Sequence, residues 1–144
     1  MFYKNVKVVI PLKISYKECP GCGLKLLNKE LELSDRYNAS GECWQLHNEL
    51  FAYFYMNPDV TFKVQHAVDA YGAQHSGGET KPITTAFSLI GLYLAIEKGY
   101  TGRQVQHAHM KLAKKQLDWP VLNRPTDRYR VTVNDVLEAQ KGEP

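Results

Sequence analysis

Three cysteines are the residues of this sequence whose types and spacing most clearly support chemistry. Cys19 and Cys22 form a C-x-x-C pair, and the two residues between them allow both sulfurs to converge on one metal ion. Cys43 follows Ser40, a candidate helix N-cap, so its thiol falls in a first helical turn, where the helix dipole favours the thiolate. Three thiolates and one further ligand form the tetrahedral shell that structural zinc prefers. The pattern therefore predicts one zinc ion per chain.

Two histidines are candidates for the fourth ligand. His47 lies one helical turn after Cys43 on the same face, which makes it the simplest local choice. His75 ends an apolar stripe that includes Val64 and Tyr71 on the next predicted helix. If the two helices are antiparallel, the end of the second lies near the start of the first. From these residues alone, both assignments stay open.

A redox pair or simple packing would account for the cysteines less well than a metal does. A C-x-x-C pair can be a redox site, and a single cysteine is often buried for packing alone. A redox pair would stand at the start of a helix after a strand, whereas the Cys-Pro-Gly-Cys-Gly segment at 19–23 favours a tight turn around a metal.

The elements that must position these ligands are mainly helices, because apolar residues recur at helical spacing along most of the chain. The predicted helices cover about residues 40–56, 59–75, 82–98 and 101–118, and a last short helix ends near 141. Short strands are predicted at 6–10 and 129–133. The third helix is apolar on almost all sides, which predicts a central helix covered by its neighbours. The expected fold is a mainly α, four-helix bundle-like domain with an N-terminal zinc knuckle and short terminal strands.

Length and composition predict one domain. The chain has 144 residues, of which 44% are hydrophobic and 23% charged, as in globular proteins. We expect the strand and knuckle in 1–39, a helical core in 40–118, and a loop, strand and short helix in 119–144. The longest apolar run, 86–96, is too short to cross a bilayer, and the first fifteen residues lack the apolar segment of a secretory signal. The odd number of cysteines then favours a reduced, cytoplasmic protein over a disulfide framework.

Two further groups of residues could contribute to a site. Asp69 lies in an apolar helical setting, where its carboxylate could orient a ligand imidazole, act as a general base, or pair with a neighbouring helix. Arg103, Lys111 and Lys114 share one face of the fourth predicted helix and could hold phosphate. A net charge of only +3 favours a solvated helix face instead, so nucleic acid is not an expected partner. No glycine-rich phosphate loop or hydrolase elbow is present in the sequence.

Four motifs carry a resemblance to a known family. They are Cys-x-x-Cys-Gly at 19–23, Gly-x-Cys-Trp at 41–44, Val-Asp-Ala-Tyr-x-x-Gln-His at 68–75 and Gly-Leu-x-Leu-x-x-Glu-x-Gly at 91–99. From Cys19 to about Ala139 the chain resembles a bacterial family of small proteins known as a domain of unknown function. The resemblance implies no activity. It marks six family positions, which are Cys19, Cys22, Cys43, Asp69, Tyr71 and His75.

The same resemblance bears on the fourth ligand. Similar proteins carry an aromatic residue where this chain has His47, which favours His75 as the ligand. The chain departs from the family pattern after that histidine, because Ser76-Gly77 stands where Pro-Gly often follows.

Two hypotheses for function follow. The first is a non-enzymatic, zinc-stabilised binding or interaction domain. The alternative is a metal-dependent enzyme whose site uses His75 with Asp69. A closed shell of four protein ligands has no position for a water, whereas a catalytic site keeps one open. Neither hypothesis identifies a ligand, a partner or an oligomeric state.

Overall fold

The computed structural model describes residues 14–123, 125 and 129–142, and it is mainly α-helical, as predicted. The described elements are β1 (Tyr16–Glu18), β2 (Lys25–Leu27), α1 (Gly41–Met56), α2 (Val64–Gln74), α3 (Pro82–Lys98), α4 (Gly102–Ala113) and α5 (Val133–Gly142). In the part of the chain that the structure describes, no helix has the length and apolar character needed to span a bilayer.

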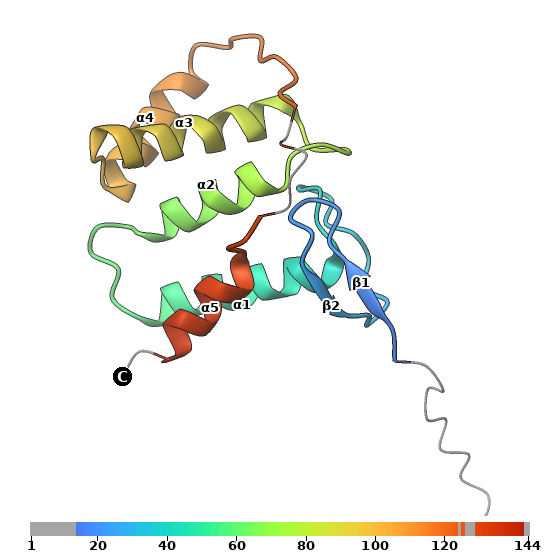
Figure 1. Cartoon of the computed structure of the whole chain (residues 1–144). Coiled ribbons are helices and arrows are strands. Elements are labelled where there is room, and N and C mark those ends of the chain that lie inside the picture. Colours follow the sequence, from blue (N-terminus) through green and yellow to red (C-terminus); the bar gives the residue numbers. More distant parts are fainter. Residues whose placement is uncertain (1–13, 124, 126–128, 143–144) are drawn as a thin grey trace, which may run out of the picture.

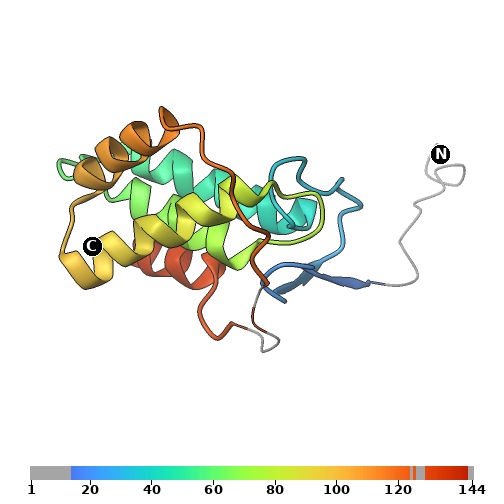
Figure 2. The ribbon, with the colours of Figure 1, turned by 90° about the horizontal axis from the view of Figure 1, so that it is seen from above.

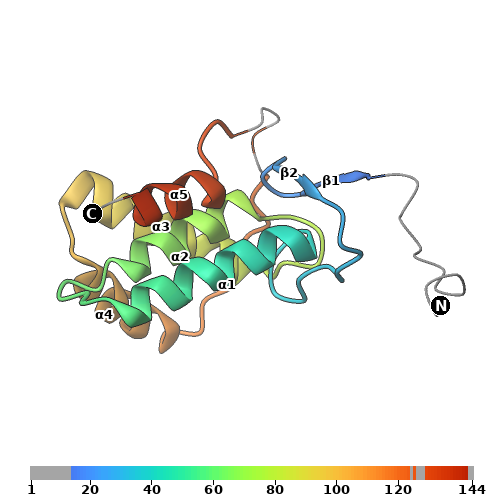
Figure 3. The ribbon, with the colours of Figure 1, turned by 90° about the horizontal axis from the view of Figure 1, so that it is seen from below.

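The central helix is α2. It packs against α3 and α4 on one side and against α1 on the other, and α5 covers α1 (Figure 1). Figure 2 shows α3 and α4 from above, and Figure 3 shows α1 and α5 side by side from below. Because α1 and α2 run in opposite directions, the start of α1 and the end of α2 lie at the same end of the molecule (Figure 1). The hairpin of β1 and β2 lies at that end.

The prediction that the third helix is central was wrong. Ile83, Tyr93 and Ile96 of α3 are exposed, and α3 buries small residues instead. Ser88 and Gly91 face α2, where a Cβ on Gly91 would overlap the Asp69 carboxylate. Small side chains allow the two helix backbones to approach closely, so the buried side of α3 is the one with the least apolar bulk.

The two strands form an antiparallel hairpin that pairs Tyr16 with Leu27 and Glu18 with Lys25. These strands were not predicted from the sequence. The strand predicted at 6–10 lies outside the described residues. The strand predicted at 129–133 is wrong, because Thr132 and Asp135 cap a helix there: the Asp135 carboxylate accepts a hydrogen bond from the Thr132 amide at 2.8 Å.

Helix boundaries differ from the prediction where single residues interrupt the helical backbone. The helix α2 begins at Val64 instead of 59, because Phe62 has a positive φ of 62° and the Asp59 carboxylate accepts the Lys63 and Val64 amides at 2.6 and 3.0 Å. The helix α4 ends at Ala113 instead of 118, and a positive φ of 49° at Gln116 prevents its continuation. The predicted start and end are confirmed for α1, which follows the Ser40 cap and ends at Met56, and for α3, which covers Pro82–Lys98.

Candidate metal centre

Four buried side chains from three segments meet at one point. The ligand atoms of Cys19, Cys22, Cys43 and His75 all lie within 4.8 Å of one another. The exposed fractions of these residues are 0, 1, 0 and 0%. The hairpin contributes the first two, the start of α1 the third, and the end of α2 the fourth, so the cluster joins segments that are remote in sequence.

The tip of the hairpin is a tight turn that places two sulfurs together. The Cys19 amide donates to the Leu24 carbonyl at 2.8 Å, and the Gly23 amide donates to the Cys19 carbonyl at 3.0 Å. Gly23 has a φ of 83°, which glycine adopts without strain. Gly21 packs directly on His75, where a Cβ would lie 2.6 Å from the ring carbon Cδ2. A larger residue at position 21 would therefore displace the imidazole.

Cys43 occupies the first turn of α1, as predicted. The Ser40 hydroxyl accepts a hydrogen bond from the Cys43 amide at 3.1 Å, which fixes the helix start. The Tyr71 hydroxyl donates to the Cys43 sulfur at 3.4 Å. A donor to the sulfur stabilises the thiolate, which is the form that binds a metal.

His75 is oriented by the carbonyl of its own helix. Its Nδ1 lies 2.6 Å from the Tyr71 carbonyl oxygen, and its ring stacks on the Tyr71 ring at a centroid distance of 3.8 Å. A carbonyl can only accept, so Nδ1 donates to it and Nε2 is the ring nitrogen left to bind a metal. Nε2 faces the cluster, 3.4 Å from the Cys43 sulfur. Metal-binding histidines commonly have this arrangement, in which the second ring nitrogen donates to a carbonyl.

Loop contacts hold the backbone of His75 in place. The His75 carbonyl accepts from the Asn38 amide at 3.0 Å and from the Thr80 hydroxyl at 3.2 Å. The Asn38 side chain also donates to the Ser76 carbonyl at 3.0 Å. The loop before α1 is thereby fastened to the end of α2.

The distances in the cluster fit a tetrahedral ion. Zinc binds sulfur at about 2.3 Å and histidine nitrogen at about 2.0–2.1 Å, so two sulfurs in a tetrahedron lie about 3.8 Å apart, and a sulfur and a nitrogen about 3.6 Å. The Cys22 and Cys43 sulfurs are 3.9 Å apart, and Cys43 sulfur to His75 Nε2 is 3.4 Å. The cysteines are free thiols, so no disulfide competes for them.

The electrostatics of the cluster favour a central positive charge. Hydrogen bonding with Cys22, and to a smaller extent with Cys43, lowers the pKa of Cys19. Hydrogen bonding with Cys19, and to a smaller extent with Cys22, raises the pKa of Cys43. Burial lowers the pKa of His75, but hydrogen bonding with Cys19 and Cys22 outweighs burial and raises it to about 9. Without a cation, Cys43 and His75 therefore hold protons, whereas Cys19 is the thiolate of the cluster. A divalent ion at this position would replace those protons and stabilise the charged sulfurs.

The chain also matches a known family. A family sequence profile covers residues 17–144, which is most of the chain and includes all four residues of the cluster. The chain belongs to DUF5946, a family of unknown function. This confirms the prediction that the chain belongs to a family of unknown function. Searches of curated proteins and of solved structures gave no match.

The second histidine considered for the site of this DUF5946 chain lies elsewhere in the core. His47 stacks on Trp44 at a centroid distance of 4.3 Å and contacts Phe51 and Tyr71 at 4.2 and 4.5 Å. Its Nδ1 lies 3.2 Å from the Asn48 side-chain oxygen. Burial lowers the pKa of His47 to about 4, so the ring is neutral. His47 is not one of the four residues whose ligand atoms converge.

Asp69 lies on the α3 side of α2. The predicted role of orienting the His75 imidazole belongs to the Tyr71 carbonyl instead. The Asp69 carboxylate accepts from Gln65 at 3.2 Å through Oδ1, and Oδ2 has no hydrogen-bond partner among the described residues. Burial raises the pKa of Asp69 to about 7. Its carboxylate instead meets Gly91 at the close contact of α2 with α3.

The basic residues of α4 are exposed to solvent. The Arg103 guanidinium lies 4.1 Å from the centroid of the Phe62 ring and donates to Gln106 at 3.1 Å. Lys111 is in the last turn of α4, and Lys114 is its C-cap residue. These three residues do not converge with the cysteine cluster.

One charged residue that positions the centre was not predicted from the sequence. Glu42, next to Cys43, accepts from the Lys29 and Leu31 amides at 3.2 and 3.1 Å and forms an ion pair with Lys17 at 3.1 Å. Burial acts to raise the pKa of Glu42, but these hydrogen bonds together lower it. The carboxylate therefore ties the hairpin and the following loop to the start of α1. An acidic residue in a first helical turn was the only sequence signal for this role.

Proposed function

We propose that this chain is a zinc-stabilised helical domain in which the metal is structural and the role is binding or interaction. The observation that carries the proposal is the orientation of His75. Its Nδ1 proton is engaged by the Tyr71 carbonyl, and its Nε2 faces three buried sulfurs. A Cys3His set of this kind completes a four-coordinate shell, which is typical of structural zinc.

The donor chemistry supports zinc over hard cations. Thiolate and imidazole ligands suit zinc, whereas calcium and magnesium prefer oxygen ligands. The position of the cluster supports a structural role, because it connects the hairpin, α1 and α2. A hairpin with strands of three residues buries too little apolar surface to be stable alone, so a metal crosslink supplies its attachment.

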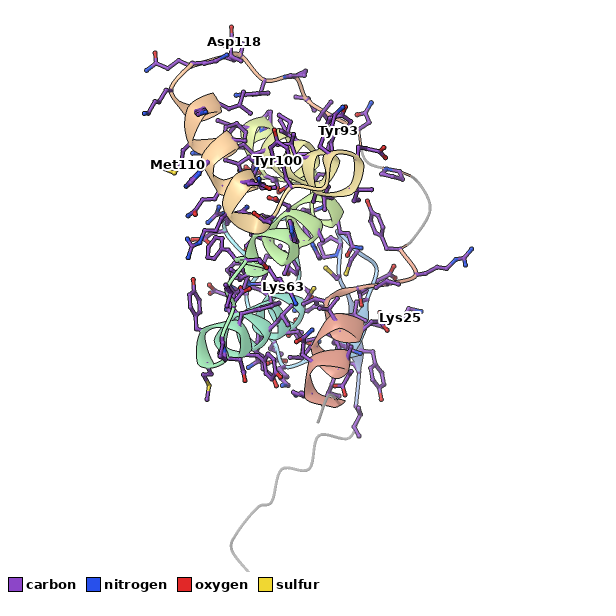
Figure 4. The ribbon with its side chains drawn as sticks, turned by 90° about the vertical axis from the view of Figure 1, so that its left-hand side faces the viewer. Lys25, Lys63, Tyr93, Tyr100, Met110 and Asp118 are labelled. Atoms are coloured by element: carbon purple, nitrogen blue, oxygen red, sulfur yellow. The ribbon has the colours of Figure 1, made fainter. Side chains whose placement is uncertain are left out.

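The surface of the α3–α4 end supports an interaction role. Tyr93, Tyr100 and Met110 lie at this end of the molecule (Figure 4), and their exposed fractions are 53, 38 and 57%. Ile96 of α3 is 74% exposed. Several exposed large apolar residues on neighbouring elements are more typical of an interaction surface than of a surface that only faces water.

Metal analysis combined with cobalt substitution tests the proposal. Freshly purified protein should carry close to one zinc per chain, and the cobalt form should show the absorption of a tetrahedral sulfur-rich site. Azide or cyanide should leave that absorption unchanged, because a closed shell has no position for an added ligand. A spectrum that shifts on anion addition would instead support the metal-dependent enzyme. A protein that carries no transition metal, with three thiols that react freely, would contradict both.

A further inference from the structure

A small cavity lies between α1, α2 and α5, and Tyr71 is among the residues that line it. Its volume is about 130 Å³. A cavity of about 150 Å³ lined by apolar side chains accepts benzene, and this cavity is slightly smaller, so a ligand can have no more than one six-membered ring. Its walls include Leu50, Phe51, Ala70 and Val136, and no charged residue is among the described residues that line it. The cavity therefore suits a neutral apolar molecule.

His47 supplies the acceptor that gives this cavity specificity, since the other polar side chains in its wall, Gln74, Thr132 and Tyr71, already have hydrogen-bond partners. His47 lines it and is only 7% exposed. Its Nδ1 is paired with the Asn48 side-chain oxygen, which accepts, so Nδ1 carries the proton of the neutral ring. Nε2 is then an acceptor, and it makes no hydrogen bond to any residue that the structure describes. Apolar pockets with a single well-placed polar group bind ligands that have one matching group.

We propose that this cavity is a binding site for a small neutral aromatic molecule with one hydroxyl donor, of the phenol class. The ring occupies the apolar space, and the hydroxyl donates to His47 Nε2. The Gln74 amide, which donates to the Val131 carbonyl at 2.8 Å, closes the rim between α2 and the segment before α5. The proposal rests on the proposed function in one respect only, that the domain binds a ligand without transforming it.

The position of the cavity gives two internal reporters of binding. Trp44 stacks on His47 at 4.3 Å, so a ligand at His47 changes the environment of the indole. Tyr71 lines the cavity and donates to the Cys43 sulfur, so a ligand also contacts the residue that supports the metal centre. The chain has two tryptophans, and a Trp119→Phe background leaves the fluorescence of Trp44 alone.

Phenol and toluene form a matched pair of probes, because they differ mainly in the donor. In the zinc-loaded Trp119→Phe protein we expect phenol to change Trp44 fluorescence saturably and to bind about 2- to 12-fold more tightly than toluene, the range of one hydrogen bond. His47→Phe keeps an aromatic ring and removes the acceptor, so the two probes should bind alike. Ala67 is a half-buried alanine in the α2 wall of the cavity. Ala67→Leu fills the cavity, and binding of both should be lost.

The outcomes separate this proposal from the previous one. Equal binding of phenol and toluene by the parent protein, or phenol binding that survives Ala67→Leu, would overturn the assignment of the cavity. Zinc content and the folded state of each variant, measured on the same samples, show whether the metal centre is intact. A protein that carries one zinc but binds neither probe would contradict only the proposal of a phenol site. A folded protein that binds phenol as expected without zinc would contradict only the proposal of a structural metal.

Discussion

Replacing His75 by alanine should remove the metal, whereas replacing His47 should not. The His75 ring is fully buried, and its loss takes one of four ligands from the cluster. It also leaves the buried Tyr71 carbonyl without its partner, which costs about 1–3 kcal/mol. The cavity left by the ring adds to this loss, since truncation of a buried aromatic side chain to alanine costs about 3–5 kcal/mol. These contributions are not additive, because they come from the same side chain. We expect the free energy of unfolding in the presence of zinc to fall by at least about 3 kcal/mol.

Stability alone does not distinguish the two histidines. His47 is packed against Trp44, Phe51 and Tyr71, so His47→Ala should also cost about 3 kcal/mol through lost packing. His47→Phe is the better control, because it keeps an aromatic ring among Trp44, Phe51 and Tyr71 and should cost less stability than His47→Ala. The decisive difference is in metal content.

Metal content and chemical unfolding, each with and without a chelator, measure the effect. Both His47 variants should retain close to one zinc, and His75→Ala should retain well below about half an equivalent. A chelator should destabilise the parent protein and the His47 variants much more than His75→Ala. His75→Cys should restore binding, because four thiolates also form a tetrahedral site. Full zinc in His75→Ala together with loss of zinc in His47→Phe would refute the assignment.

Three other changes test separate parts of the structure. Cys43→Ser removes a ligand and the sulfur that accepts from the Tyr71 hydroxyl, so it should lose about 2 kcal/mol or more in thermal unfolding; unfolding that matches the parent with and without a chelator would mean that this sulfur is not a ligand. The raised pKa of Asp69, about 7, means that the native state keeps its proton between about pH 4 and 7 while the unfolded state releases it, so stability falls as pH rises through this window. In urea titrations Asp69→Asn should lack this fall and be more stable by roughly 2–4 kcal/mol near pH 8, and an identical pH profile in both proteins would contradict the shift. The exposed Arg103, Lys111 and Lys114 should support at most weak DNA binding that disappears near physiological salt, which fluorescence anisotropy across a salt series would show; tight sequence-selective binding there would contradict this.

The parts of the fold that follow from local signals were predictable. The Ser40 cap placed Cys43 in the first turn of α1, and Gly99, with a φ of 66°, ended α3 as expected. The apolar stripe from Val64 to Tyr71 correctly placed His75 at the buried end of α2, but these local signals did not decide between His75 and His47 as the fourth ligand. Caps, stops and helical periodicity depend on residues close in sequence, so one chain is enough to identify them.

The parts that depend on tertiary contacts were not predictable. The strands β1 and β2 have only three residues each, too few for an alternating pattern. The apolar pattern of α3 correctly indicated a helix, but it could not show which side of that helix is buried. The side with Gly91 packs against Asp69, and Ile96 is exposed. The contacts of Glu42 with Lys29 and Leu31 likewise depend on how a loop folds back on α1.

The separation of the four ligand residues along the chain has a consequence for the order of folding. The helices α2, α3 and α4 follow one another in sequence and pack together, so their contacts close short loops and can form early. The hairpin reaches His75 only across more than fifty residues of chain, and it has little apolar surface to hold it there until an ion binds. We therefore expect the hairpin to order last and to open first. Under zinc limitation, amide exchange and proteolytic cleavage should concentrate in residues 14–40 while α2 and α3 stay protected. The N-terminal segment would then be degraded at zinc concentrations at which the helices are still folded.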